Sequence, residues 1–306
     1  MKRTLIKLGA SSLVVSLPPR WTSKYSLKQG ATIELEEHHN TLLLRPGTSV
    51  PIRKTSIDLS GLPGLYKRIV ASAYLSGSDE ITVTYKAPEL GRILTARVRD
   101  MISMEVIAQE KGRLVIKDIS GSSSTDIEPL LRRVFHMVQT VLDEASRALE
   151  HPRNLEYLQD MESGINRITD HCMRLLIKYG YNEPAKTPIM YAFVLLLEQV
   201  ADECKQITNY CIDYKIGLTQ AQQRFFVSIK ELFEAQQELF YSFSHESAAR
   251  LAKQRDVLVR GITKHLTLCR SVSESQVWRS LKELSEAIIR LLSQSLSLAA
   301  LGSRVG

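Results

Sequence analysis

The sequence is poor in cysteine: its 306 residues include only four, Cys172, Cys204, Cys211 and Cys269, and none forms a Cys-x-x-Cys pair. Because all four fall within helical patterns, we expect reduced core thiols rather than disulfides or thiolate metal sites, as is usual in the cytoplasm. No apolar run reaches the roughly 18 residues that a membrane span needs. The first residues also lack the apolar stretch and cleavage site of a signal peptide. These absences predict a cytoplasmic protein without membrane insertion.

Signatures of catalysis are also missing. The segment Gly61-Leu62-Pro63-Gly64 is too short for a phosphate-binding loop, and no Lys-Ser/Thr pair follows it. No Ser/His/Asp set is recognisable by spacing, and His38 and His39 fall in a predicted hairpin turn. His171 follows Asp170 on a predicted helix but points about 100° away from it. We therefore predict that the protein is not an enzyme.

The charge of the chain is unevenly distributed. The net charge at pH 7 is +7, from 40 Lys and Arg against 33 Asp and Glu. Residues 1–50 carry +4, residues 51–120 carry +3, and residues 121–306 are neutral, with 22 residues of each sign. A basic module tethered to a neutral body indicates a polyanionic partner. The alternative is a surface that only keeps the protein soluble.

Residues 1–46 predict four short strands and one helical turn. Alternating and β-branched apolar residues mark the strands, and Pro18-Pro19 opens the helix. Strands are expected at 5–8, 13–17, 32–36 and 41–45, with the helix at 18–26 and a turn at 38–40. So short a segment cannot bury a two-sided core by itself. We therefore expect it to pair with a second copy.

Two further domains follow, separated by segments of flexible composition. Residues 46–51 have a linker composition, and residues 121–124 form a joint. Between them, a β-α-β-α-β-β order predicts a small α/β domain over 52–119. Beyond the joint, apolar residues three and four apart predict six long antiparallel helices over 124–302. The predicted fold class is therefore mixed and multidomain, with a small β domain over 1–46, an α/β middle domain and an all-α body.

The N-terminal domain matches a known family in four segments. These are Lys7-Leu8-Gly9, Ser12–Pro18, Leu27–Gly30 and Ile33-Glu34-Leu35. In order and spacing they resemble the swapped-hairpin domains of the AbrB/SpoVT family. The resemblance implies that two copies interleave their strands into one β-barrel, whose basic face binds double-stranded DNA. The sequence departs from the family pattern at Ala10 and Ala31, where an arginine and an acidic residue are common.

The cationic residues of this domain are the candidates for DNA contact. Lys2, Arg3 and Lys7 lie at nearby positions on or before the first strand. Arg20 and Lys24 are four residues apart and share a face of the short helix. A dimer presents the set twice, so that counterion release supplies most of the affinity. The alternative is that these cations are solvated residues on a barrel that only dimerises.

Two segments of the helical domain carry carboxylates at helical spacing. Glu198–Glu203 contains a Glu-x-x-x-Asp pair, Glu198 and Asp202, and Glu162–Arg167 has Glu162 followed by Asn166. Both segments resemble signatures of the PhoU family, regulators of phosphate uptake built from two three-helix bundles. Side chains four residues apart share a helix face, so facing rows of oxygen ligands are expected.

PhoU proteins carry metal clusters at these positions, so the resemblance implies a site for divalent or ferric metal ions in the first three-helix bundle. Its candidate ligands are Glu162, Asn166, Asp170, Glu198 and Asp202. Asn166 stands where the family has a second acid, and Asp170 lies one turn later on the same face. The alternative is that these acids are ordinary solvent-facing residues.

The second half of the helical domain lacks such rows. Gln254–Arg260 falls where acids are expected on the fifth helix, and Lys282 replaces the glutamate of the signature on the sixth. Because a basic residue disfavours a bound cation, we predict that this half holds no metal. It is expected instead to pack against another subunit or a transporter protein.

Together these features predict a DNA-binding transcriptional regulator of phosphate uptake that is a homodimer or a higher oligomer. Its helical body would sense through bound metal or by docking on the ATPase subunit of a phosphate transporter. One alternative is a PhoU-like metal-binding adaptor of a phosphate ABC transporter, whose barrel serves only dimerisation. A second is an antitoxin, against which the long helical body argues.

Overall fold

The computed structural model describes residues 2–38, 41–47, 52–62, 64–120, 126–150 and 156–302. Packing divides the chain into two compact units, Met1–Arg53 and Lys54–Gly306, each considered by itself below. Several predicted connections lie outside the described residues: 39–40 of the hairpin turn, 48–51 of the linker, and the joint at 121–124. The same holds for residues 151–154, where Pro152 is expected to separate the first two long helices.

The first unit consists of two separate hairpins and a short helix. β1 (Ile6–Leu8) pairs antiparallel with β2 (Ser12–Val14), and β3 (Ile33–His38) pairs with β4 (Thr41–Pro46). Between the hairpins, α1 (Pro19–Lys24) has proline in its first turn, which suits a position that needs no amide donor. The described residues of one chain form no closed barrel. The predicted strands and helical turn are all present, and β2 is shorter than expected.

The second unit begins with an α/β layer. The elements are β5 (Lys54–Asp58), α2 (Tyr66–Leu75), β6 (Glu80–Thr84), α3 (Glu89–Val98), β7 (Met104–Glu110) and β8 (Arg113–Asp118). This is the predicted β-α-β-α-β-β order. The strands form one sheet in the order β5-β6-β8-β7, in which β5 and β6 are parallel and the other pairs antiparallel.

The core of the α/β layer lies between the sheet and its two helices. Ile81 and Val83 of β6 pair in register with Ile116 and Leu114 of β8, and all four side chains are buried. Residues of α2 and α3 belong to the same hydrophobic cluster. Because side chains alternate across a strand, this register leaves the opposite sheet face to polar residues such as Lys54, which pairs with Glu80 at 3.0 Å.

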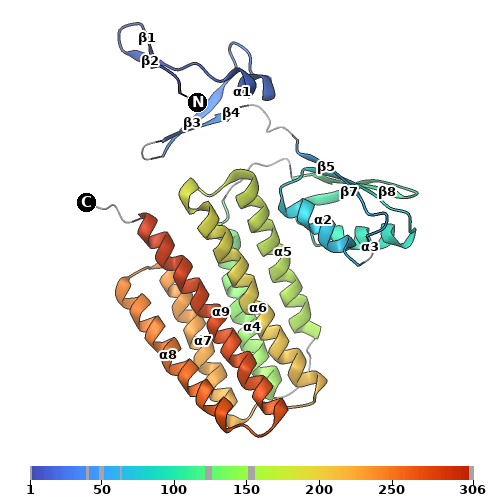
Figure 1. Ribbon diagram of the computed structural model, residues 1–306, viewed down its shortest axis with the longest axis vertical. Helices are drawn as coiled ribbons and strands as arrows, with labels where there is room; N and C mark the ends of the chain where they lie inside the picture. The colour runs from blue at the N-terminus through green and yellow to red at the C-terminus, as the bar shows by residue number, and fades with distance from the viewer. Residues whose placement is uncertain are drawn as a thin grey trace. The chain divides into compact units, whose positions relative to one another are not determined.

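The rest of the second unit is helical, as predicted (Figure 1). The helices are α4 (Glu128–Glu150), α5 (Glu156–Tyr179), α6 (Thr187–Asp213), α7 (Gln220–Tyr241), α8 (His245–Leu268) and α9 (Val272–Gly302), with a 3-10 turn, η1 (Pro184–Lys186), before α6. Local signals set several ends. Gly180, with φ of 80°, follows α5, a common way to end a helix. Thr219 and Gln222 form a capping box at the start of α7.

The six helices form two halves that share one hydrophobic core. Helices α4, α5 and α6 pack on one another, α7, α8 and α9 do likewise, and α4 against α7 and α6 against α9 join the halves. Buried apolar residues of all six helices belong to a single cluster. Cys172, Cys204 and Cys211 are buried in it on α5 and α6, as predicted, whereas Cys269 lies just after α8 and is only partly buried; all four are free thiols.

Two further features of the second unit bear on function. Helix α2 packs against α5, so the α/β layer is attached to one side of the helical body. Helix α9 is long and apolar enough to cross a membrane by length and composition alone, a test that core helices of soluble proteins also pass. Here it packs against α6, α7 and α8.

Candidate functional site

The five cationic residues predicted to contact DNA are all exposed. Lys7 lies on β1, with Lys2 and Arg3 just before it, and Arg20 and Lys24 lie on α1. The Lys24 Nζ atom lies 5.1 Å from the centre of the Tyr25 ring, in a cation–π contact. These five exposed cations are accessible to a polyanion from solvent.

Apolar side chains of the same unit are also exposed. On the first hairpin, Ile6 is 59% exposed, and Leu8 and Leu13 are each 64% exposed; on the second, Leu35 and Leu42 are each 64% exposed. In a single copy these side chains are left in water, at a cost of about 25 cal/mol for each Å² of apolar surface. Several large apolar side chains left exposed on so small a unit indicate that another surface covers them.

Four of the five predicted metal ligands meet between α5 and α6. The Glu162 side chain is buried; its Oε1 accepts a 2.7 Å hydrogen bond from the Asn166 amide, and its Oε2 lies 2.8 Å from Lys205 Nζ. On α6, Glu198 accepts a 3.0 Å hydrogen bond from the Thr169 hydroxyl. Asp202 of α6 lies close enough to Glu162 for the two carboxyl groups to interact. Side chains spaced by four residues on two facing helices therefore build one carboxylate cluster.

The electrostatics of this cluster are those of acids without enough cations. Burial and the nearby carboxylates of Asp170, Asp202 and Glu162 raise the pKa of Glu198 to about 7, although the hydrogen bond from Thr169 opposes the shift. Burial and the contact with Glu162 raise the pKa of Asp202, and Lys205 offsets only part of this shift. The Asn166 Oδ1 atom is buried and has no hydrogen-bond partner.

The fifth predicted ligand, Asp170, has a different partner. Its carboxylate lies 3.6 Å from the guanidinium of Arg97, which belongs to α3 of the α/β layer. Burial raises the pKa of Asp170, and Arg97 opposes the shift. Asp170 therefore stands between the carboxylate cluster and the contact with the α/β layer.

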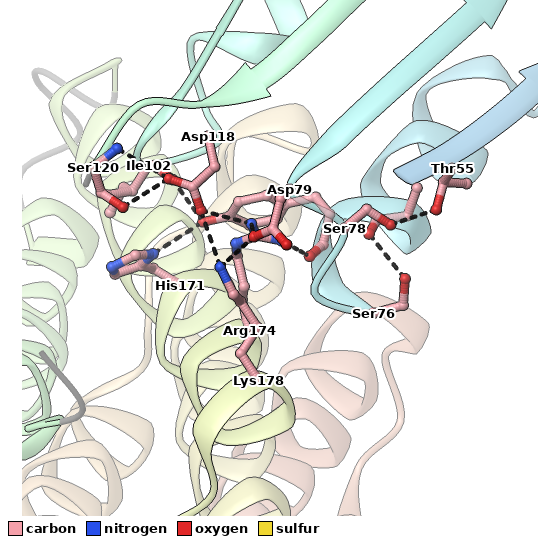
Figure 2. A network of polar contacts seen from close by, with 12 residues as sticks. Thr55, Ser76, Ser78, Asp79, Ile102, Asp118, Ser120, His171, Arg174 and Lys178 are labelled. Atoms are coloured by element: carbon pink, nitrogen blue, oxygen red, sulfur yellow. Dashed lines mark hydrogen bonds and ion pairs between the residues drawn. The ribbon is translucent and has the colours of Figure 1, made fainter. Parts of the chain in front are cut away.

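That contact is a network of charged side chains on α5 (Figure 2). Arg174 is only 1% exposed; it donates to the Tyr74 backbone carbonyl at 2.7 Å and to Asp118 at 2.8 Å. Lys178 donates to Asp79 at 2.5 Å and to Asp118 at 3.3 Å. The Tyr74 hydroxyl lies 3.1 Å from His171 Nδ1. Arg174 and Lys178, one turn apart on α5, thus pair with the acidic side chains of Asp79 and Asp118 from the α/β layer.

The pKa values agree with firm pairing in this network. Burial raises the pKa of Asp118, but hydrogen bonds from Arg174 and Ser120 outweigh it and hold this pKa well below its usual range. Burial and the positive charge of Arg174 lower the pKa of His171. The imidazole is therefore neutral at pH 7 and serves as a hydrogen-bond partner of Tyr74.

The predicted metal site contains both groups that suit a cation and one that disfavours it. Oxygen atoms of Glu162, Asn166, Glu198 and Asp202 suit a hard or borderline cation, and the unpartnered Asn166 oxygen is open to one. The Lys205 ammonium, however, already contacts Glu162. Within the described ranges, no group of three or more His, Cys, Asp or Glu side chains is arranged to hold a metal ion. The residues fit a cation only if the Lys205 side chain turns away from Glu162.

The second half of the helical body has an ion pair at the corresponding level. The Arg255 guanidinium of α8 contacts Glu286 of α9 and also lies 2.9 Å from Asp256. Arg255 stands as far from the start of α8 as Asn166 stands from the start of α5. The two segments that lack a row of acids therefore contact each other through an ion pair, in which Arg255 neutralises the charge of Glu286.

Sequence reasoning missed the residues that complete both polar sites. Lys205 lies three residues after Asp202, on the same helix face, so its spacing was a usable signal. Arg97, Arg174 and Lys178 gave no such signal, because their partners lie in a different segment. The hydrogen bond from Arg174 to Tyr74, for example, joins residues 100 positions apart.

Comparisons with protein-family models, with curated proteins and with solved structures found no match to this chain.

Proposed function

We propose that this chain is a cytoplasmic transcriptional regulator whose N-terminal unit binds double-stranded DNA as a homodimer. The observation that carries the proposal is the combination, in one unit, of exposed apolar hairpins and exposed cations. Both the resemblance of residues 1–46 to the AbrB/SpoVT family and the concentration of positive charge in the first 120 residues support it.

Dimerisation follows from the exposed hairpins. A second copy would bury Leu8, Leu13, Leu35 and their neighbours and so supply the core that 46 residues lack. In the proposed swapped-hairpin barrel, the strands of the two copies interleave. The dimer then carries Lys2, Arg3, Lys7, Arg20 and Lys24 twice. Their contacts with phosphates would make the affinity fall steeply with salt.

The test is binding of the full-length protein to a labelled duplex from its own promoter, followed by fluorescence anisotropy across a salt series. We expect Arg20→Glu with Lys24→Glu to weaken binding at least tenfold and to flatten the salt dependence. Arg133→Glu with Arg167→Glu, at exposed positions of α4 and α5, makes the same change in charge and should leave binding unaltered. Unchanged binding by the first variant would sink the proposal and favour an adaptor whose N-terminal unit only dimerises.

The helical body is proposed to be the sensor, as its resemblance to PhoU regulators of phosphate uptake implies. Glu162, Asn166, Glu198 and Asp202 would hold a divalent or ferric ion, and Asp170 would connect this site to Arg97 of the α/β layer. When bound, such an ion would neutralise carboxylates that repel one another. A phosphate transporter's ATPase subunit is the proposed protein partner.

Metal binding is tested by thermal unfolding with added Mn²⁺ or Fe³⁺. Since a ligand that binds only the folded state stabilises it, we expect the ion to raise the Tm of the wild type but not of Glu198→Gln. An equal rise in both proteins would show that the ion binds elsewhere.

A further inference from the structure

Helices α5 and α8 hold corresponding places in the two halves of the helical body (Figure 1). Each has 24 residues. Helix α5 packs on α4 and α6, and α8 packs on α7 and α9. The outer side of α5 is covered by α2 of the α/β layer, whereas α8 packs extensively, among the described elements, only on α7 and α9. The outer face of α8 is therefore the uncovered counterpart of a face that is occupied on α5.

This outer face carries a stripe of basic residues around one apolar side chain. Arg250, Lys253, Val257, Arg260 and Lys264 follow one another at spacings of three and four residues, so they share one side of α8. All five are exposed, and Val257 is 58% exposed. Residues 121–306 as a whole carry 22 residues of each sign, so the stripe gathers on one face of α8 positive charge that is balanced by acids elsewhere in this part of the chain.

A groove runs beside the stripe between α7 and α8. One section has a volume of about 570 Å³, and its apolar lining includes Phe225, Leu232 and Leu258. A second section, toward Ser247, shares Arg250 and Gln254 with the first. From Ser247 to Gly261 the groove follows α8 for about 20 Å, at 1.5 Å per residue. This length suits a helix of several turns rather than a small molecule.

Gly261 lets the Phe225 ring pack closely against α8 at the far end of the groove. A Cβ atom at this position would lie 2.7 Å from two ring carbons of Phe225, closer than atoms can approach. The missing side chain therefore lets the Phe225 ring lie against α8, where it also packs edge-on against Trp278. The floor of the groove is thus held in place by an aromatic contact.

We propose that the α7–α8 groove binds an acidic amphipathic helix of another protein. Its apolar side would lie on Phe225, Leu232 and Val257, and its acidic side would face Lys253 and Arg260. On α5, the basic side chains of Arg174 and Lys178 pair with Asp118 and Asp79 of the α/β layer, so acidic groups cover basic ones at the corresponding face. Helices that lie in apolar grooves are a common mode of recognition, and opposite charges fix their register.

Other occupants fit less well. Nucleic acid would use the cations but not the apolar floor. The N-terminal residues 1–50 of a chain carry a net charge of +4, so the stripe, which has the same sign, would repel them. The inference goes beyond the proposed DNA binding and does not depend on it.

The probe is a fluorescein-labelled peptide of about 16 residues, long enough for the groove at 1.5 Å per residue, with leucines along one helical side and glutamates elsewhere. Fluorescence anisotropy measures its binding to the full-length protein, and the same peptide with lysines in place of glutamates is the control. We expect saturable binding of the acidic peptide alone. Lys253→Glu with Arg260→Glu, and separately Val257→Asp, should weaken it at least tenfold. Circular dichroism and thermal unfolding check that these surface variants fold.

The control protein is Arg133→Glu with Arg167→Glu, which has the same change in charge away from α8 and should bind the peptide like the wild type. The proposal is overturned if the acidic peptide does not bind saturably, or if the control variant weakens binding as much as the α8 variant. It is also overturned if Val257→Asp lowers the oligomeric state in sedimentation, because a second copy would then occupy the groove. Loss of duplex-DNA binding in the α8 variant, without saturable peptide binding, would assign the stripe to DNA instead.

Discussion

The two halves of the helical body build the same arrangement of three helices around different polar interiors. Between α5 and α6, the carboxyls of Glu162, Glu198 and Asp202 come together with a single lysine, Lys205. Between α8 and α9, Glu286 meets the guanidinium of Arg255. At the level where α8 carries this arginine, α5 carries only an amide, Asn166. Acids that are paired in one half thus remain undercompensated in the other.

The difference matters because buried acids with raised pKa values destabilise a fold. Such groups are concentrated at functional sites, where another requirement retains them. On the outer faces of the two halves, it is the basic residues that differ in whether they have partners. The basic face of α5 is covered by the α/β layer, and the basic stripe of α8 is open. Each half therefore has one group of charges without enough partners. In α4–α6 it is the buried carboxylate cluster, and in α7–α9 it is the exposed basic stripe of α8.

The largest expected effect is on stability, when the ion pairs between α5 and the α/β layer are broken. Replacing Arg174 by Met leaves the carboxylate of Asp118 and the Tyr74 carbonyl without their buried donor. Breaking a buried pair from one side costs about 3–5 kcal/mol of unfolding free energy, which urea unfolding followed by circular dichroism measures. Arg260→Met on the open face of α8 should change stability by no more than about 0.5 kcal/mol. A loss below 1 kcal/mol for Arg174→Met would mean that the α/β layer does not depend on this network.

The second effect concerns the only cation seen in the carboxylate cluster among the described residues. Without metal, Lys205→Met should cost about 2–3 kcal/mol at pH 8, because Glu162 loses its charged partner while buried among other acids. The loss should shrink at pH 5, where Glu198 and Asp202 are largely protonated. Lys230→Met provides the control, since its pair with Asp143 at 2.5 Å is partly exposed. It should cost at most about 1 kcal/mol at either pH, and an equal loss in both variants would contradict the comparison.

The helical body was well predicted because its signals are local and repeated. Apolar periodicity predicted six long helices over 124–302, and the described part of this range contains α4 to α9, with Gly180 after α5 and Thr219 before α7. Spacing of four residues also brought Glu198 and Asp202 to one face, opposite Glu162. The strands of the first unit were predicted less closely; β2 ends at Val14 rather than near Leu17. The extent of a strand depends on what pairs with it, which lies outside its own sequence.

The contact between the α/β layer and α5 could not have been predicted from such patterns. Periodicity shows that α5 has a polar side but not which segment covers it. Asp79 and Asp118 reach Lys178 from loops and strand ends about 100 and 60 residues away. Their pairing depends on how the α/β layer packs against the helical body, and the spacing of residues along the sequence carries no information on that geometry.

The smallest expected effect has opposite signs in the two halves. The pKa of Glu198 is about 7 in the folded protein, against 4.5 for an unperturbed glutamate. The folded state therefore holds its proton more tightly, and its stability falls as the pH rises from about 4.5 to about 7. Glu198→Gln removes this penalty. In metal-free buffer it should raise the unfolding free energy by about 1–3 kcal/mol at pH 8 and by little at pH 5.

The matched change in the other half, Glu286→Gln, should lower stability by about 1 kcal/mol at pH 8, because Arg255 loses its charged partner. Urea unfolding of both variants at pH 5 and pH 8, with EDTA present, measures the contrast. If Glu198→Gln were also destabilising at pH 8, the carboxylate would be a structural partner in its own right. The α4–α6 cluster would then be as well compensated as the Arg255–Glu286 pair, and the physical reason to expect a bound cation there would disappear.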